Sequence, residues 1–305
     1  MCNNTPSTGS APRKKIGFLA YSEPWIIDLM THLKELNCNL DFEFISVAET
    51  TPESFKDYAI IIDRLSYTEG YLQSLLCGYS LRGTYVINNP FTYACDDKFV
   101  GLKVAEQLNI RVPYTLFLPP KTLSYDYKDV VKTIDIEKLS EKIRFPAIMK
   151  PVYGWGWQDV FYINNLEELK QKYTLFENEP VLLQEFIPYQ HYVRAFVIGK
   201  SRILPIKYDP QNRAYIYDVC HLSRELGEII LNASEKLCRA LDYDINTIEF
   251  AIKENEVFAI DFFNTVPEIK RENLPEEYYW WIVKNCAEFI CELLRENRKN
   301  RQILI

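Results

Sequence analysis

The stretch Asn246–Glu268, NTIEFAIKENEVFAIDFFNTVPE, decides how the rest of the chain is interpreted. Two largely apolar runs flank the polar residues Lys253–Glu256, a pattern that predicts two strands joined by a tight turn. Each strand places one carboxylate among apolar residues, Glu249 and Asp261, and Asn264 follows soon after. Buried carboxylates need partners because desolvation costs several kcal/mol. Two acids and an amide oxygen at paired strand ends suit Mg²⁺, unless both acids face water from a half-exposed hairpin.

Composition sets broad limits on the class of protein. At 305 residues the chain can bury a large core, and its length favours two or three domains. The net charge of −7 argues against nucleic acid or an anionic membrane as the main partner. No apolar run is long enough to span a membrane. The eight cysteines show no metal-ligand spacing, so we expect reduced thiols in a cytoplasmic protein.

The first part of the chain alternates strand-like and helix-like segments. We expect strands at 16–21, 41–47, 58–64 and 84–89, and helices at 22–37 and 69–81. Ser22 is the expected cap of the first helix. Strands that alternate with helices indicate a parallel sheet covered on both faces. Residues 14–95 are therefore predicted to form an N-terminal α/β domain, after a disordered polar tail at residues 1–13.

The remainder predicts two α+β domains, a central one at 96–188 and a C-terminal one at 189–305. In the central domain we expect helices at 96–108, 136–143 and 165–173, and strands at 112–120, 145–152, 159–163 and 180–187. In the C-terminal domain we expect strands at 192–199, 202–208 and 214–219, a helix at 223–241, the opening hairpin, and a last helix at 276–298.

Two lysines stand at positions that suit phosphate binding. Lys150 ends an apolar strand, FPAIMKP, directly before a loop that contains Gly154 and Gly156. The ammonium supplies charge, and the glycines let backbone N–H groups approach anionic oxygens, although a plain turn between strands would look the same. Lys98 follows Asp96 and Asp97 at the start of a helix. The acids suit the helix dipole, whereas a lysine there opposes it, which suggests a functional reason.

Three further features face the same predicted site. The segment Gln184–Ile187 ends a strand at a domain junction, where its backbone groups could contact a purine ring, although an ordinary strand end is the alternative. Arg194 and Lys207 each alternate with apolar neighbours, so we expect both on the sheet face that carries Glu249 and Asp261. Two such cations would stabilise charge on a transferring phosphoryl group; surface cations on a sheet are the alternative.

Taken in order, six motifs resemble those of the ATP-grasp superfamily. They are DDK at 96–98, FPAIMKP at 145–151 with its glycine loop, LLQEFI at 182–187, VRAFVIG at 193–199, TIEF at 247–250 and AIDFFN at 259–264. The resemblance covers residues 85–270, and the preceding α/β domain matches the domain that usually comes before an ATP-grasp unit. Similar proteins include glutathione synthetase and the ligases that modify ribosomal protein S6, and phrases such as GTYVINNPF resemble a bacterial subgroup.

The resemblance implies a role for each motif. ATP phosphates would be held by Lys98 and Lys150, under a loop carrying Gly154 and Gly156. The adenine would be lined by Gln184, Glu185, Phe186 and Ile187, with Glu185 and Ile187 offering backbone groups. Mg²⁺ would be held by Glu249, Asp261 and Asn264, in a motif one residue longer than the common Glu-x-Asn. The γ-phosphate and an acyl phosphate would be steadied by Arg194 and Lys207.

The activity implied by the resemblance is ligation of a carboxylate to an amine, dependent on ATP and Mg²⁺ and passing through an acyl phosphate. The substrates would be small molecules or peptides, and a homodimer is compatible with this interpretation. A small-molecule kinase is one alternative, but for a polyphosphate substrate it would need a basic pocket, and the acidic chain shows no lysine cluster for one. A non-catalytic nucleotide-binding protein is another. No residue identifies the acyl donor or acceptor.

Overall fold

A computed structural model of the chain describes residues 13–36, 39–51, 54–95, 97–122, 134–154 and 156–302. The predicted tail lies outside these residues except for Arg13. By their contacts the described residues form two compact units, one from the ranges 1–91 and 280–305 and the other from the range 92–279. In the part of the chain that the structure describes, no helix combines the length and apolar character needed to cross a membrane.

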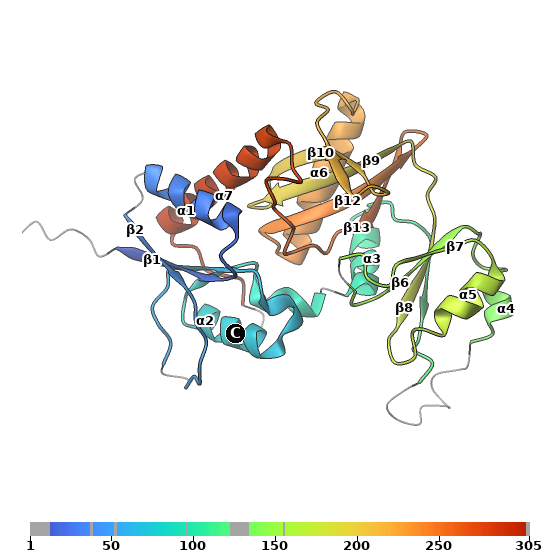
Figure 1. Cartoon of the computed structure of the whole chain (residues 1–305), viewed down its shortest axis with the longest axis horizontal. Helices are drawn as coiled ribbons and strands as arrows, with labels where there is room; N and C mark the ends of the chain where they lie inside the picture. The colour runs from blue at the N-terminus through green and yellow to red at the C-terminus, as the bar shows by residue number, and fades with distance from the viewer. Residues whose placement is uncertain are drawn as a thin grey trace, which may run out of the picture. The chain divides into compact units, whose positions relative to one another are not determined.

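The first unit is built on a parallel sheet of order β2-β1-β3-β4. Its strands are β1 (Lys14–Leu19), β2 (Leu40–Phe44), β3 (Ile60–Asp63) and β4 (Tyr85–Ile87). Helices α1 (Pro24–Glu35) and α2 (Gly70–Leu81) cover opposite faces of this sheet (Figure 1). This arrangement confirms the predicted α/β fold. The N-cap of α1 is Glu23 rather than the predicted Ser22, because Pro24 has the backbone angle that suits the first helical position.

The second unit contains a small antiparallel sheet of order β5-β8-β6-β7. Its strands are β5 (Thr115–Leu118), β6 (Ala147–Pro151), β7 (Phe161–Ile163) and β8 (Val181–Glu185). Helices α4 (Ile136–Leu139) and α5 (Leu166–Tyr173) bury their apolar residues on one face, around Met149 and Leu183. Lys150 pairs with Leu182 and therefore lies on the other face, which Gln184 shares.

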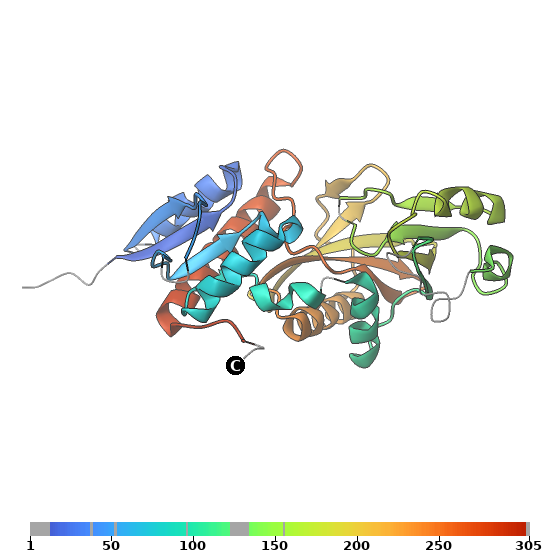
Figure 2. The same ribbon diagram turned by 90° about the horizontal axis from the view of Figure 1, so that it is seen from below.

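A larger antiparallel sheet of order β11-β10-β9-β12-β13 completes the second unit. Its strands are β9 (His191–Ile198), β10 (Arg202–Asp209), β11 (Ala214–Ile216), β12 (Ile245–Lys253) and β13 (Glu256–Asp261). Helices α6 (Arg224–Leu241) and α3 (Lys98–Gln107) pack on one face of it (Figure 2). Ala105 of α3 lies in the same apolar core as Val193, Ile248 and Phe250. The other face carries the charged residues of the candidate site.

The opening hairpin forms as predicted. Lys253 and Glu256 are the last ladder partners of β12 and β13. Between them Glu254 and Asn255 both have positive φ, at 51° and 66°, which is the type I′ turn that matches the twist of a two-residue hairpin.

The end of the chain belongs to the first unit. Helix α7 spans Glu276–Glu296, and the division by contacts assigns the chain from residue 280 onward to the first unit, whereas the sequence predicted a C-terminal domain at 189–305. Lys14 donates from Nζ to the carbonyl of Leu294 at 2.6 Å, and the buried side chain of Asn300 bonds to Val86 of β4. These contacts are made far apart in sequence, so local patterns did not reveal them.

Candidate functional site

Glu249 and Asp261 face each other across the β12–β13 hairpin as direct ladder partners. Glu249 is only 6% exposed, and both of its oxygens are hydrogen-bonded. Oε1 accepts from Nη2 of Arg194 at 2.7 Å, and Oε2 accepts from the hydroxyl of Tyr192 at 2.6 Å. These charge-assisted bonds offset the desolvation of the buried carboxylate. Glu249 is therefore buried and does not point to water. The alternative of a half-exposed hairpin required that it should.

Arg194 lies in β9 directly opposite Glu249 and is held on several sides. Its Nη1 donates to the hydroxyl of Tyr215 at 3.1 Å, and its guanidinium lies 4.9 Å from the centre of the Tyr208 ring. Burial is the largest single effect and works to lower the pKa of Arg194, but the Glu249 carboxylate together with Tyr215 and Tyr208 raises it more, so the pKa lies above its ordinary value. Burial, and then the charge of Glu249, raise the pKa of Tyr192 well above its ordinary value. Tyr192 thus stays protonated and donates to the Glu249 carboxylate.

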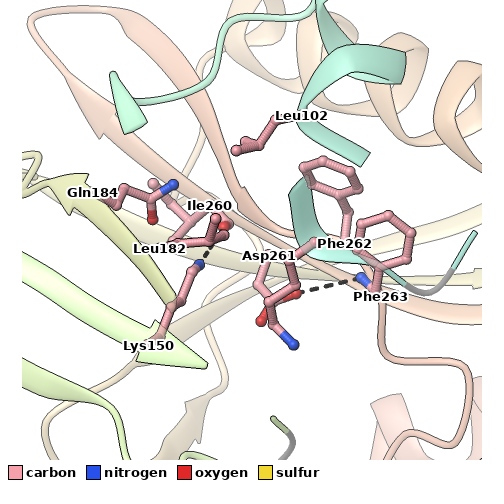
Figure 3. Close-up of a pocket in the computed structure, with 9 residues that line it drawn as sticks. Leu102, Lys150, Leu182, Gln184, Ile260, Asp261, Phe262 and Phe263 are labelled. Carbon is pink, nitrogen blue, oxygen red and sulfur yellow. Dashed lines mark hydrogen bonds between the residues drawn. The ribbon is translucent and has the colours of Figure 1, made fainter. Parts of the chain in front are cut away.

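Asp261, Lys150 and Lys98 line one small cavity. Figure 3 shows Asp261 and Lys150 at this cavity. Nζ of Lys150 donates to the carbonyl of Ile260 at 3.1 Å. Burial lowers the pKa of Lys150, against the opposing effect of the Asp261 carboxylate. Burial works to raise the pKa of Asp261, but Lys98 and Lys150 outweigh it and hold the pKa below its ordinary value. The Asp261 carboxylate is therefore ionised between two lysines.

The cavity itself is small, with a volume of about 10 Å³. This is roughly the space that one water molecule requires. Beside this cavity the side-chain nitrogens of Lys150 and Lys98 are bonded to backbone carbonyls.

Lys98 sits at the first residue of α3, and Asp97 is the cap of that helix. The Asp97 carboxylate accepts from the backbone N–H groups of Phe99 at 2.8 Å and Val100 at 3.0 Å. The acid therefore serves the helix end, as the dipole argument predicted. Asp96 lies outside the described residues. Nζ of Lys98 donates to the carbonyl of Gly154 at 2.5 Å, which joins the start of α3 to the glycine loop.

The two glycines of the loop meet different requirements. A Cβ atom at Gly154 would lie 2.3 Å from Cγ of Pro151, closer than any side chain tolerates. Gly156 has φ of +63° and open space around it, so glycine is favoured there by backbone conformation alone.

Other residues of the loop anchor it to its surroundings. The hydroxyl of Tyr153 donates to the Asp97 carboxylate at 3.1 Å. The ring of Trp157 lies 5.8 Å from the guanidinium of Arg213, in the turn between β10 and β11. Trp155 lies outside the described residues. The loop is thus fastened to α3 on one side and to the large sheet on the other.

The predicted purine-binding segment follows the end of β8. Gln184 is 2% exposed and donates from Nε2 to Oγ1 of Thr115 at 3.1 Å. The N–H of Glu185 donates to the carbonyl of Tyr114 at 2.8 Å and is therefore already used. The N–H of Ile187 makes no hydrogen bond to any described residue. The ring of Phe186 packs 5.1 Å from the ring of Tyr162.

Lys207 lies on the other face of the large sheet from Arg194. Arg194 is opposite Ile206 in the ladder, whereas Lys207 is opposite Val193, which belongs to the core beneath α6. Directly opposed residues share a face, and neighbouring residues of a strand point to opposite faces. Nζ of Lys207 pairs with the Asp218 carboxylate at 2.9 Å. The prediction that Lys207 faces the two acids is therefore wrong.

The oxygen donors near the hairpin end fit a magnesium ion. The carboxylate of Asp261 accepts a long bond, 3.4 Å, from the N–H of Phe263, and the side-chain amide of Asn264 bonds to none of the described residues. Glu249 accepts one bond at each oxygen and keeps further lone pairs. The described residues include no group of three acidic, histidine or cysteine side chains placed to hold a metal. Two carboxylates and an amide oxygen are the ligand types that Mg²⁺ prefers, so the chemistry of Glu249, Asp261 and Asn264 is compatible with this ion.

Sequence reasoning did not assign the tyrosines that surround Arg194 to this cluster. Tyr192 stands two residues before Arg194 in the same strand, so the strand period already placed it on the same face. Tyr208 and Tyr215 are ladder partners in β10 and β11, and only the register of those strands brings them to the guanidinium.

Sequence comparisons connect the chain with known proteins. A model of RimK-like ATP-grasp domains matches residues 95–258. The carbamoyl phosphate synthase large chain of a Thermoanaerobacter species is 25% identical over 211 residues, which are 65% of this chain and 18% of that protein. The formate-dependent phosphoribosylglycinamide formyltransferase of Prochlorococcus marinus is 24% identical over 153 residues, 45% of this chain and 38% of that protein. The chain thus spans less than two fifths of the length of these curated relatives.

Solved structures share the fold along most of the chain. A D-alanine–D-alanine ligase from Bacillus anthracis, complexed with ATP, has a TM-score of 0.68 at 18% identity and covers 95% of this chain and 100% of its own. A RimK domain ATP-grasp protein from Sphaerobacter thermophilus has a TM-score of 0.65 at 17% identity, covering 91% of this chain and 99% of its own. The predicted combination of an α/β domain with an ATP-grasp fold is confirmed by these structures.

Proposed function

The chain belongs to the RimK-like ATP-grasp domain family, and from this premise we propose that it is an ATP- and Mg²⁺-dependent ligase that joins a carboxylate to an amine. The observation that supports this proposal most directly is the charge arrangement around Asp261. Two lysines hold the acid ionised from one side, and Glu249 faces it across the hairpin. Phosphates and a divalent cation have complementary charges to these groups.

The proposed roles follow the position of each side chain. Lys98 and Lys150 bind the phosphates of ATP beneath the loop of Gly154 and Gly156. The adenine lies against Gln184, Glu185, Phe186 and Ile187, where the unused N–H of Ile187 offers a donor. Mg²⁺ is held by Glu249, Asp261 and Asn264, and when bound it neutralises charge on the transferring phosphoryl group.

Arg194 keeps its proposed role of steadying the γ-phosphate and the acyl phosphate, because it lies on the same face as Glu249. The support for the same role in Lys207 is lost, since that residue faces the core side and pairs with Asp218. Arg194 also orients Glu249 through their hydrogen bond, so its loss would disturb both charges.

The proposed reaction has two steps that the site residues promote by binding and orientation. A carboxylate oxygen of the donor attacks the γ-phosphorus, the bond from that phosphorus to the β-phosphate oxygen breaks, and ADP leaves. An amine nitrogen then attacks the carbonyl carbon of the acyl phosphate, the bond to phosphate breaks, and the amine loses a proton to form the amide. The products are ADP, phosphate and the amide.

Small carboxylates and amines, free or in a peptide, are the proposed partners. We place the activity in the cytoplasm, where ATP is available and thiols stay reduced. The cysteines whose side chains are described, Cys77, Cys220, Cys238, Cys286 and Cys291, form no disulfide.

The test follows ADP and free phosphate separately while panels of carboxylates, amines and polyols are added. Phosphate release that depends on an amine, with amide formed in equal amount, supports the ligase. ADP formed without free phosphate indicates a kinase, and binding of ATP without turnover by any panel member indicates a nucleotide-binding protein.

Two variants test the site assignment itself. Asp261→Asn and Lys150→Ala should each lower amine-dependent phosphate release roughly 100-fold or more, the size of effect seen when one preorganised charge is lost. Lys170→Ala is a suitable control. Lys170 lies on α5, and its ion pair with Glu137 is accessible to solvent. Turnover that survives unchanged in both site variants would contradict the assignment.

A further inference from the structure

Asn246 is a fully buried amide next to the metal-binding end of the hairpin. It is 0% exposed, and it lies in β12 on the face that packs against α6. A buried amide is costly unless its donors and acceptor are bonded. Nδ2 donates to the carbonyl of Phe262 at 2.8 Å and contacts Sγ of Cys238 at 3.6 Å, and Oδ1 accepts from the N–H of Asn264 at 2.9 Å. The amide is thus bonded on both sides.

These bonds continue the hairpin beyond the point where its ladder ends. β13 ends at Asp261, and the next residues leave the regular pairing with β12. The side chain of Asn246 then binds Phe262 and Asn264 in the way that a backbone peptide group would. The backbone N–H of Thr247 also donates to the carbonyl of Asn264 at 3.3 Å. Both backbone groups of Asn264 are therefore fixed, while its side chain bonds to none of the described residues.

We propose that Asn246 is a positioning residue of the metal site. Its amide holds the segment Phe262–Asn264 so that the free side-chain amide of Asn264 and the carboxylate of Asp261 are presented to the same cation. Asn246 does not touch the metal; it acts through the backbone of Asn264. This inference rests on the proposed role of Asp261 and Asn264 in holding Mg²⁺.

The chemistry at this position is specific to asparagine. Alanine would leave the Phe262 carbonyl and the Asn264 N–H without their present partner in a buried place. Aspartate has the same shape and keeps an acceptor for Asn264, but an ionised carboxylate has no donor for the carbonyl of Phe262. Asn246→Asp should therefore lose the hydrogen bond to Phe262 and keep the one from Asn264.

The test measures metal affinity rather than turnover. Mn²⁺ is titrated into the full-length protein in the presence of a non-hydrolysable ATP analogue, and free Mn²⁺ is followed by electron paramagnetic resonance. Asn246→Ala should weaken Mn²⁺ binding about 10- to 100-fold, the usual effect of removing a group that orients a ligand. Binding of the analogue without metal should change less than about twofold, because the lysines and the purine segment are untouched.

Cys238→Ala is the matched control. It removes a core sulfur atom that the Asn246 side chain contacts. It leaves in place both hydrogen bonds between the Asn246 amide and the backbone of Phe262 and Asn264. Its Mn²⁺ affinity should equal that of the unaltered protein even if its thermal stability falls. Equal weakening in Cys238→Ala and Asn246→Ala would show a general effect of core damage and would overturn the proposal. Should Asn246→Ala not fold, Asn246→Asp, which loses only the bond to Phe262, should still weaken Mn²⁺ binding more than Cys238→Ala does.

A double-mutant cycle with Asn264→Ala separates this inference from the proposed function. If Asn246 acts through Asn264, the double variant should bind Mn²⁺ no more weakly than Asn264→Ala alone. Fully additive losses would overturn the positioning role. Unchanged Mn²⁺ affinity in Asp261→Asn would instead defeat the proposed metal site, whereas a loss in Asp261→Asn with none in Asn246→Ala would defeat only the role of Asn246.

Discussion

At the scale of single residues, the charge of Lys150 depends strongly on its surroundings. Burial lowers its pKa, so it loses its proton at a lower pH than a free lysine would. Only the protonated form attracts phosphate. We therefore expect the affinity for a non-hydrolysable ATP analogue to fall as pH rises from neutral toward about 10, below the ordinary lysine range. Calorimetric titrations across this range measure the effect.

Lys150→Arg provides the comparison for this prediction, because arginine keeps its charge throughout the range. Its affinity profile should be flat even if its affinity is lower. The lowered pKa of Lys150 also affects the stability of the protein without nucleotide, and this stability rises with pH where the affinity for the analogue falls. The unfolded chain keeps the proton to higher pH, so the contribution of Lys150 to stability increases as pH rises through its folded pKa. A wild-type affinity that is constant with pH would contradict the prediction.

The same scale shows what the sequence could reveal about the site. Glu249 and Asp261 were identifiable because acids stand out among apolar residues of a strand, and Lys98 and Lys150 because of their positions beside a helix start and a glycine loop. The structure brings Lys98, Lys150 and Asp261 around one cavity. The prediction for Lys207 was wrong because it used only the alternation of apolar and polar residues within one strand. The sheet face on which the Lys207 side chain lies depends on the register of β10 with β9.

At the scale of elements, helix α3 and the end of the hairpin meet at Gly101. A Cβ atom there would lie 2.0 Å from Cε2 of Phe263 and 2.8 Å from Cε2 of Phe262. Gly101→Ala should therefore lower the free energy of unfolding by about 1–3 kcal/mol, the usual cost of overpacking a core. This loss should appear despite the better helix propensity of alanine, and chemical denaturation measures it.

Gly227→Ala is the matched control for this contact. Gly227 also lies in a helix, α6, but an added Cβ would meet no atom within 4 Å. There alanine should stabilise the protein by about 0.5–1 kcal/mol, because only helix propensity changes. A smaller side chain at the contact, as in Phe263→Leu, should restore part of the loss in Gly101→Ala. Similar behaviour of the two glycine variants would mean that α3 does not pack as described.

Most elements were predictable because their residues carry strong local signals. The helix at 223–241 was recognisable from its cap and its spacing, and Ser223 does accept from the N–H of Leu226 at 3.3 Å. The start of α1 was misplaced by one residue because a serine and a proline compete to define the same helix end. The path of the chain after Asp261 could not be predicted. It depends on hydrogen bonds from the side chain of Asn246, and in the sequence Asn246 looks like an ordinary strand residue.

At the scale of the whole molecule, Asn300 joins the end of the described chain to the first sheet. Its Oδ1 accepts from the N–H of Val86 at 2.7 Å and from Oγ of Ser80 at 3.1 Å, and its Nδ2 donates to the carbonyl of Val86 at 2.8 Å. Asn300→Ala would leave both backbone groups of Val86 without these bonds in a buried place. We expect the free energy of unfolding to fall by at least about 2 kcal/mol in urea denaturation.

Asn285→Ala serves as its control, since the Asn285 amide donates to the carbonyl of Trp281 within the same helix, α7. That substitution should change stability by less than about 0.5 kcal/mol. If Asn300→Ala is equally mild, the side chain does not act as a substitute strand edge for β4. The predicted C-terminal domain at 189–305 could not include this contact, because its partners are 214 residues apart.

The return of residues 280–302 to the first sheet affects how the protein is made. Domains of a growing chain usually fold in order from the N-terminus. Here the segment that supplies Asn300 leaves the ribosome after the whole of residues 92–279, which form a compact unit of their own. We therefore expect the second unit to complete its folding first, and the buried edge of β4 to be paired only after residue 300 has left the ribosome.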